Sequence, residues 1–253
     1  MTKKTILQQF GAQAADYVDS ATHARGASLV RLVELVQPQP QWQVLDIATG
    51  TGHTAIAFAP HVARVRATDI TPQMMDQARQ LLAERGLNNV IVETADAENL
   101  PYEDNTFDLV TCRIAPHHFD DVPRFVRESA RVMHSGGLLA VVDNVVPTGP
   151  AGDYVNAFEK LRDPSHGRCL TLLEWTAAFQ EANLAIQHQE TLQKTVNFPF
   201  WAKRHDPIMQ AYLRSMLTEI TGPAAVFLNP QETAEGITFQ LLEALHIGAK
   251  PEK

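Results

Sequence analysis

Short apolar runs alternate with amphipathic segments through residues 40–147. The apolar runs predict buried strands, and the amphipathic segments between them predict helices. One helix begins at Thr71-Pro72, a pair typical of an N-cap and the first helical position. The predicted strands are QVLDIA (43–48), VARVRATDI (62–70), NNVIVETAD (88–96), FDLVTCRIA (107–115) and, after a turn at HSGG, LLAVVDNVVP (138–147). This alternation predicts a parallel sheet with helices on both faces and right-handed crossovers.

The two flanks of this region have a more helical pattern. Residues 5–36 carry an apolar stripe, so we expect an N-terminal helical cap at 1–38, ahead of a main domain at 39–253. The segments predicted after Pro150 are helices near 151–163 and 171–182, a strand at 185–193 and a helical insertion at about 197–230. The last segment, GITFQLLEALHIGA (236–249), suits a final strand, although a helix is nearly as compatible with its residues.

The composition excludes several classes of protein. The chain has 253 residues, 45% of them hydrophobic, and a net charge of −8, which disfavours a nucleic-acid partner. The two cysteines lie far apart and predict neither a zinc site nor a disulfide framework. The N-terminus lacks the apolar stretch of a signal peptide, and no segment reaches the roughly 18 apolar residues of a membrane span. We therefore expect a cytoplasmic protein.

Two glycines follow the first strand, in VLDIATGTGHTAIAF. Gly50 and Gly52 leave the backbone bare at the carboxyl edge of the predicted sheet, where open α/β folds bind ligands. The helix that follows presents free N–H groups to an anionic group. The string also satisfies the G-x-G-x-x-A dinucleotide fingerprint, ending at Ala55, but a structural turn without a ligand would have the same residues.

Asp69 ends the second predicted strand, beside this turn. Its carboxylate is placed to accept hydrogen bonds from both hydroxyls of an adenosine ribose, and its charge would repel a 2′-phosphate. The alternative is an acidic residue that only favours the start of the next helix.

Two further carboxylates distinguish between cofactors. Asp46 lies within the first strand, where it can face an ammonium group, a group that S-adenosylmethionine has and NAD lacks. Asp96 follows the third strand, where it can accept from an adenine amino group beside the Ala97 backbone N–H. Asp96 is otherwise a loop or capping residue.

These motifs, together with ADAENLPYEDNTFDLV and RVMHSGGLLAVVD, resemble class I S-adenosylmethionine-dependent methyltransferases. The likeness covers residues 40–147 and is greatest to the small-molecule branch that includes ubiquinone and menaquinone biosynthesis enzymes. It implies a Rossmann-like, doubly wound α/β sheet of seven strands in the order 3-2-1-4-5-7-6, with strand 7 antiparallel. It also implies S-adenosyl-L-methionine as cofactor, S-adenosyl-L-homocysteine as product, and a small-molecule acceptor. The implied cofactor contacts are Tyr17 on the N-terminal cap, Asp46, Gly50, Gly52, Asp69, Ile70, Asp96 and Ala97.

The acceptor side is expected above the fourth strand, around CRIAPHHF. His117 and His118 are candidate catalytic bases, although adjacent histidines before a helix are often packing residues. Arg113 either reaches the cofactor carboxylate or an acidic acceptor, or forms an ion pair. The candidate acceptor-binding residues are Arg162, Asp163, His166 and Arg168, in a polar loop, and Trp201, which with Phe198 and Phe200 forms either a lid or a packed core.

Other functions remain as alternatives. Asp143-Asn144 resembles the metal-binding pair of catechol-type methyltransferases, but Arg113 stands where those enzymes have an Asp, so we expect no metal. A nicotinamide oxidoreductase is disfavoured by Asp46 and Asp96, and a nucleic-acid methyltransferase by the acidic balance. We expect a methyltransferase enzyme, although the sequence barely constrains the alternative of a non-catalytic cofactor-binding protein of the same fold. The acceptor, the methylated atom and the oligomeric state are left open.

Overall fold

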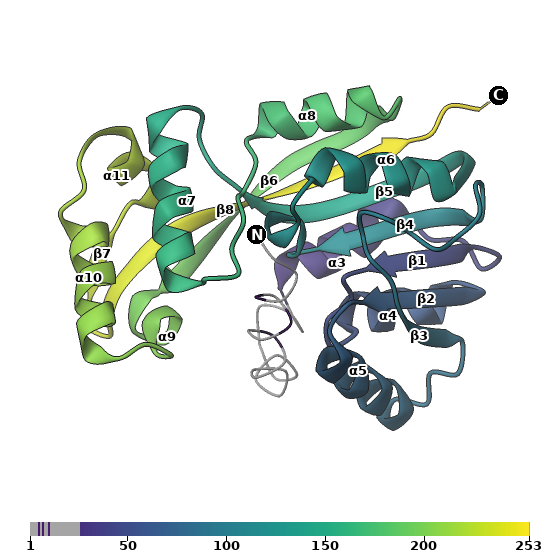
Figure 1. Cartoon of the computed structure of the whole chain (residues 1–253), viewed down its shortest axis with the longest axis horizontal. Helices are drawn as coiled ribbons and strands as arrows, with labels where there is room; N and C mark the ends of the chain where they lie inside the picture. Colours follow the sequence, from purple (N-terminus) through teal and green to yellow (C-terminus); the bar gives the residue numbers. More distant parts are fainter. Residues whose placement is uncertain (1–4, 6, 8–9, 11–25, 253) are drawn as a thin grey trace.

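The computed structural model describes residues 5, 7, 10 and 26–252, and its centre is one mixed sheet (Figure 1). The strands run in the order β3-β2-β1-β4-β5-β8-β6, with β7 paired to β8. Strands β1 to β5 are mutually parallel, whereas β8 is antiparallel to β5, β6 and β7. The strands are β1 (Gln43–Ile47), β2 (Arg64–Asp69), β3 (Val90–Thr94), β4 (Phe107–Arg113), β5 (Met133–Val145), β6 (Ala185–Asn197), β7 (Gln231–Thr233) and β8 (Gly236–Ala249).

The predicted fold class and strand order are therefore confirmed, with β8 as the antiparallel seventh strand. The short β7 was not predicted. One local prediction is wrong: HSGG is not a turn before β5 but part of it. Gly136 N donates to Lys250 O at 2.9 Å, and Lys250 N donates to Gly137 O at 2.9 Å, so the C-terminal segment continues the sheet over these glycines.

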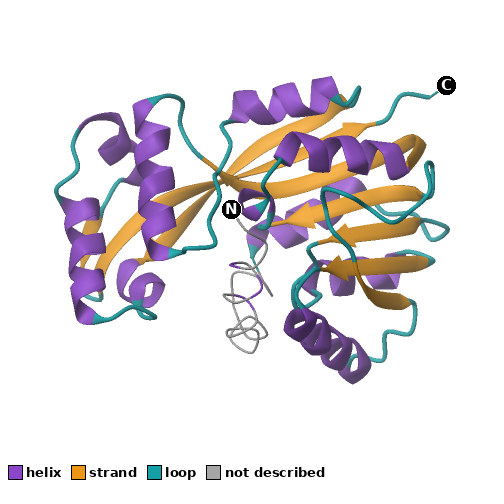
Figure 2. Cartoon of the chain, in the orientation of Figure 1, coloured by secondary structure: helices purple, strands orange, loops and turns teal. Residues whose placement is uncertain are grey.

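Helices cover both faces of the sheet (Figure 2). One core, which contains Phe125, Trp175 and Phe179, lies between the sheet and α6 and α8. The other contains Leu32 and Phe58 and lies under α3 and α4. The helical elements are α3 (Ala27–Val36), α4 (His53–Phe58), η1 (Ala59–His61), α5 (Pro72–Glu84), η2 (Pro116–His118), α6 (Val122–Val132), α7 (Pro150–Arg162), α8 (Leu172–Glu181), α9 (Phe198–Ala202), α10 (Pro207–Thr218) and α11 (Gly222–Leu228).

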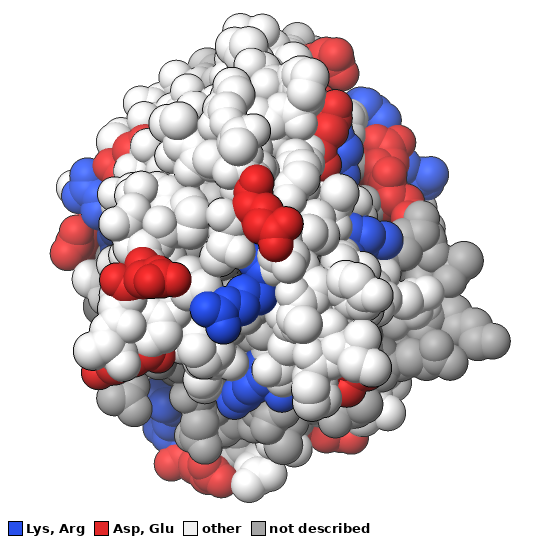
Figure 3. Space-filling view, turned by 90° about the vertical axis from the view of Figure 1, so that its left-hand side faces the viewer, with Lys and Arg blue, Asp and Glu red and all other residues white. Residues whose placement is uncertain are grey.

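Strands β6 and β8 extend past the other strands and carry a helical unit of α7 and α9–α11, on the left in Figure 1. Trp201 stacks on Phe158 at 4.8 Å between ring centroids and meets Phe239 edge-on at 5.2 Å. The outer surface of this unit carries few charged side chains (Figure 3), and Ile208, Tyr212 and other large apolar residues are exposed there. GITFQLLEALHIGA is a strand throughout, because its period-two pattern buries Phe239 and its neighbours against this unit.

Candidate active site

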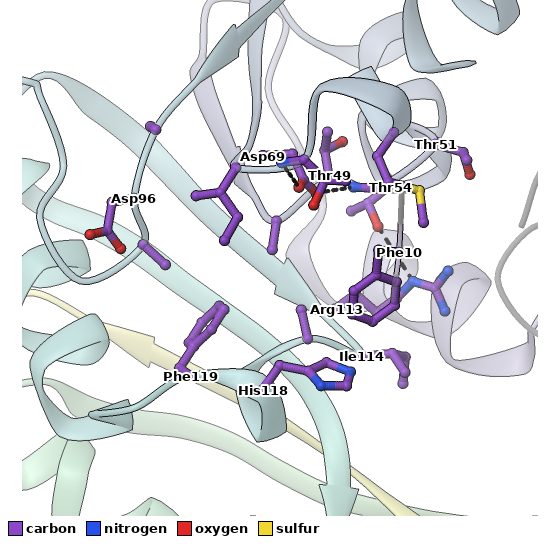
Figure 4. Close-up of a pocket in the computed structure, with 18 of the residues that line it drawn as sticks. Phe10, Thr49, Thr51, Thr54, Asp69, Asp96, Arg113, Ile114, His118 and Phe119 are labelled. Carbon is purple, nitrogen blue, oxygen red and sulfur yellow. Dashed lines mark hydrogen bonds between the residues drawn. The ribbon is translucent and has the colours of Figure 1, made fainter. Parts of the chain in front are cut away.

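A cleft with a cavity volume of about 120 Å³ opens at the carboxyl ends of β1, β2 and β4 (Figure 4). Ligands of open α/β sheets bind at this edge. Predicted site residues that line the cleft are Gly50, Asp69, Ile70, Asp96, Ala97, Arg113 and His118. Tyr17 lies outside the described residues. Two phenylalanines line the cleft, Phe10 in the N-terminal cap and Phe119 after η2, and sequence reasoning missed both.

The two glycines of the turn have different roles. Gly50 has a φ of +55°, and an added Cβ would meet nothing within 4 Å, so its backbone faces open space in the cleft. Gly52 has a φ of +89°, and its Cβ would lie 3.3 Å from the Cβ of Ala78 on α5. Gly50 therefore leaves room for a ligand, whereas Gly52 allows the turn and α5 to approach closely.

The Asp69 carboxylate is fixed at the tip of β2. Gly50 N donates to its Oδ2 at 2.9 Å, and Thr71 N donates to Oδ1 at 2.8 Å. Burial raises the pKa of Asp69, and these backbone N–H groups lower it only in part. Each carboxylate oxygen has a second lone pair for a ligand, so the side chain is oriented before any ligand arrives.

Asp46 lies beneath the turn and does not line the cleft. It is 1% exposed, and its oxygens accept from Thr49 Oγ1 at 2.6 Å and Thr111 Oγ1 at 2.8 Å. Burial raises its pKa to about 6, although both hydroxyls and Arg113 lower it. Asp46 thus ties the turn to β4.

The two ends of the cleft differ in polarity and charge. Ile70 and Met74 give one wall an apolar surface next to Asp96 and Ala97, which follow β3. At the other end, Arg113 Nε donates to Thr54 Oγ1 at 3.4 Å. Burial lowers the pKa of Arg113, against the opposing effects of two carboxylates. The cleft therefore offers acceptors and apolar contact at one end and a cation at the other.

Two histidines lie in η2, directly after β4. His117 Nδ1 is 2.6 Å from Asp143 Oδ1, and His117 N donates to Asp143 Oδ2 at 2.7 Å. Burial is the largest single influence and lowers the pKa of His117, but Asp143, together with Glu159 and Asp163, raises it, so the net pKa is above its ordinary value. His118 lines the cleft, where its ring meets Phe10 at 4.9 Å between centroids. Burial and the neighbouring His117 lower the pKa of His118 to about 3.

The polar loop predicted to bind the acceptor supports this turn instead of lining the cleft. His117 O accepts from Gly167 N and Arg168 N, and His118 Nδ1 is 2.8 Å from Ser165 O. Asp163 Oδ1 in turn accepts from Ser165 N at 2.9 Å.

The other residues predicted to bind the acceptor also have partners within the protein. The His166 ring contacts Asn156, and the Arg168 side chain pairs with Glu174. Trp201 is packed in the helical unit, and the Arg162 guanidinium lies 5.3 Å from its ring centroid. The spacing along the sequence predicted that these residues lie near the site, but it did not predict the direction of their side chains.

Comparisons with known proteins agree with this geometry. Residues 45–141 match the model of a methyltransferase domain. The uncharacterized methyltransferase YcgJ of Bacillus subtilis is 38% identical over 205 residues, which cover 81% of this chain and 80% of YcgJ. The solved structure of BH2331 from Bacillus halodurans, described as a methyltransferase, is 32% identical with a TM-score of 0.85, and covers 89% of this chain and 100% of that one. Demethylmenaquinone methyltransferase of Deinococcus radiodurans is 38% identical over 122 residues, 47% of this chain and 49% of that protein.

The fold and the site thus define a class I S-adenosylmethionine-dependent methyltransferase. This chain belongs to the methyltransferase family of YcgJ. Within residues 5, 7, 10 and 26–252, no helix is long and apolar enough to cross a membrane. The same residues contain no group of three or more His, Cys, Asp or Glu side chains arranged to hold a metal ion.

Proposed function

We propose that this enzyme binds S-adenosylmethionine in the cleft between β1, β2 and β4 and methylates a small-molecule acceptor. The observation that carries the proposal is the Asp69 carboxylate, which two backbone N–H groups fix beside the bare backbone of Gly50. A fixed acid next to an open turn fits a ribose with two neighbouring hydroxyls. The open space at Gly50 and the donors and acceptors of the walls fit the rest of the cofactor.

We assign each group of residues in the cleft wall to one part of the cofactor. Asp69 accepts from the ribose hydroxyls, and Asp96 accepts from the adenine amino group, with Ile70 packed on the ring and the Ala97 N–H beside it. Arg113, at the other end of the cleft, faces the cofactor carboxylate. Asp46 acts indirectly, because its carboxylate holds Thr49 in the turn.

Methyl transfer needs alignment and, for an oxygen or nitrogen acceptor, removal of a proton. The bound cofactor supplies a methyl group activated on a sulfonium. His118 lines the cleft and, with a pKa of about 3, is neutral at pH 7, so it accepts a hydrogen bond that positions the acceptor. The His117–Asp143 pair behind it has the higher proton affinity and takes up the released proton.

A small molecule is the acceptor class that fits best. The net charge of −8 opposes a polyanionic substrate. The relatives include enzymes named for methylation of demethylmenaquinone and of 2-methyl-6-phytyl-1,4-hydroquinone. The helices at 198–228 and the N-terminal cap are the segments that we assign to covering the acceptor and the cofactor.

Calorimetry tests the cofactor assignment directly. We expect S-adenosylhomocysteine to bind with a micromolar Kd and NAD to show no comparable heat. Transfer of label from methyl-tritiated S-adenosylmethionine to a small-molecule fraction of a cell extract tests the reaction itself. Binding of NAD in place of S-adenosylhomocysteine would contradict the proposal.

A further inference from the structure

Glu159 is a buried acid on the inner face of α7. The residue is 8% exposed and lies between Val155 and Arg162 on the face of α7 that carries Phe158 into the core of the helical unit. Within the part of the chain that the structure describes, no group donates to its buried Oε1. A buried polar atom without a partner is destabilising and is retained where it has another use.

The cations around Glu159 are occupied elsewhere. Burial raises the pKa of Glu159 and the Asp163 charge adds to this, whereas Arg162, His117 and Lys194 lower the pKa without forming a hydrogen bond to Glu159. Lys194 pairs with Glu243 at 3.2 Å, and His117 with Asp143 at 2.6 Å. The Arg162 guanidinium lies over the Trp201 ring. Three cations and the Asp163 carboxylate thus act on Glu159, and no group among the described residues donates to its Oε1.

The position of Glu159 places it on the acceptor side of the site. Helix α7, labelled in Figure 1, follows β5, which carries Asp143 near its carboxyl end. Lys160 Nζ on α7 donates to His166 O, and the His166 ring centroid lies 5.4 Å from that of His117. The charge of Glu159 acts on His117, although Glu159 does not line the cleft assigned to the cofactor. A group of the acceptor that extends from His118 toward α7 would meet this carboxylate.

We propose that Glu159 recognises the methyl acceptor by accepting a hydrogen bond from a hydroxyl or protonated amino group of that molecule. The proposal deepens the proposed function and rests on it. A carboxylate can only accept, so its partner must donate. An acceptor with a carboxylate at this place would be repelled by Glu159, Asp143 and Asp163 together.

The test uses the full chain saturated with S-adenosylhomocysteine. The three probes, benzyl alcohol, benzylamine and benzoate, each contain a benzene ring and differ in the polar group. Ligand-observed NMR should show that the wild type binds the alcohol or the amine at least about tenfold more tightly than benzoate. Glu159→Met, which keeps the length of the side chain but removes the carboxylate, should lose this preference. Glu159→Gln, which keeps one carbonyl oxygen, should retain part of it for the alcohol. Glu181→Gln, an exposed position at the end of α8, is the matched control and should behave as wild type.

Two further measurements distinguish a binding role of Glu159 from a structural role. The Glu159→Met variant should melt at or above the temperature of the wild type, because it removes an unsatisfied acid. Its Kd for S-adenosylhomocysteine should stay within about twofold of wild type. Three results would each overturn the role of Glu159. They are the absence of a binding preference in the wild type, an unchanged preference in Glu159→Met, and a melting temperature of Glu159→Met that is several degrees below that of the wild type. Failure of the wild type to bind S-adenosylhomocysteine would count instead against the proposed function.

Discussion

Asp143 contacts both the ring and the backbone of His117. One carboxylate oxygen lies 2.6 Å from His117 Nδ1, and the other accepts a hydrogen bond from the His117 backbone N–H at 2.7 Å. The pair joins the end of β5 to η2, so two parallel strands fix one imidazole. The carboxylate places the Nδ1 proton between the two residues and leaves Nε2 as the basic nitrogen of the neutral ring.

Replacement of Asp143 should therefore change the chemistry of His117 more than the binding of the cofactor. In Asp143→Asn the pKa of His117 should fall, because the main influence that raises it is lost. We expect turnover to fall by about 100-fold, the lower range for loss of general acid–base catalysis. The Kd for S-adenosylhomocysteine should remain within about twofold. Asp153→Asn, an exposed acid on α7, is the control. Wild-type turnover in Asp143→Asn would exclude the pair from proton transfer.

The two histidines should titrate as a coupled pair. Burial is the largest influence that lowers the pKa of His118 to about 3, and His117 is the next. In His117→Asn the pKa of His118 should rise, yet stay below the ordinary value of about 6.5, because the burial remains. NMR titration of the imidazole Cε1–H signals measures this shift. An unchanged His118 titration would show that the ring charges do not interact.

Loss of the Asp69 carboxylate should weaken cofactor binding. Asp69→Ala removes the acceptor proposed for two ribose hydroxyls and also releases the Gly50 N–H. We expect the Kd for S-adenosylhomocysteine to rise by at least about tenfold, since unsatisfied buried donors are costly. Calorimetry gives the Kd directly. Asp76→Asn, exposed on α5, should bind as wild type, and equal affinity in Asp69→Ala would disprove the ribose assignment.

Asp46 should make the folded state less stable as the pH rises. Its folded pKa of about 6 lies above the unfolded value, so the folded protein holds this proton over a range in which the unfolded chain has lost it. Stability should decrease by about 2 kcal/mol between pH 4 and pH 7 on this account, because the pKa shift is about two units and the unfolded carboxyl is still partly protonated at pH 4. Asp46→Asn should lack that contribution, and urea unfolding at several pH values compares the two slopes. Parallel slopes would contradict the buried acid as their cause.

Much of the fold and part of the site follow from local sequence patterns. The alternation of apolar runs and amphipathic helices specifies a parallel sheet, because strands buried on both faces need crossover helices. Gly50 and Asp69 were identified because strand ends of such a sheet meet at one edge. The error at HSGG has a tertiary cause: Lys250, which directly follows β8, pairs with Gly136, and no local pattern contains that contact.

The sequence by itself determined the fold class, the glycine turn and the acid beside it, since these depend on residues close together in the chain. Only the tertiary structure decided which side chains face the cleft. Asp46 is buried beneath the glycine turn, the loop with Asp163 and His166 supports the histidine turn, and the buried Oε1 of Glu159 accepts no hydrogen bond from the residues that the structure describes. The physical reason is that orientation and burial are set by packing between segments far apart in the chain, which spacing along the sequence does not encode.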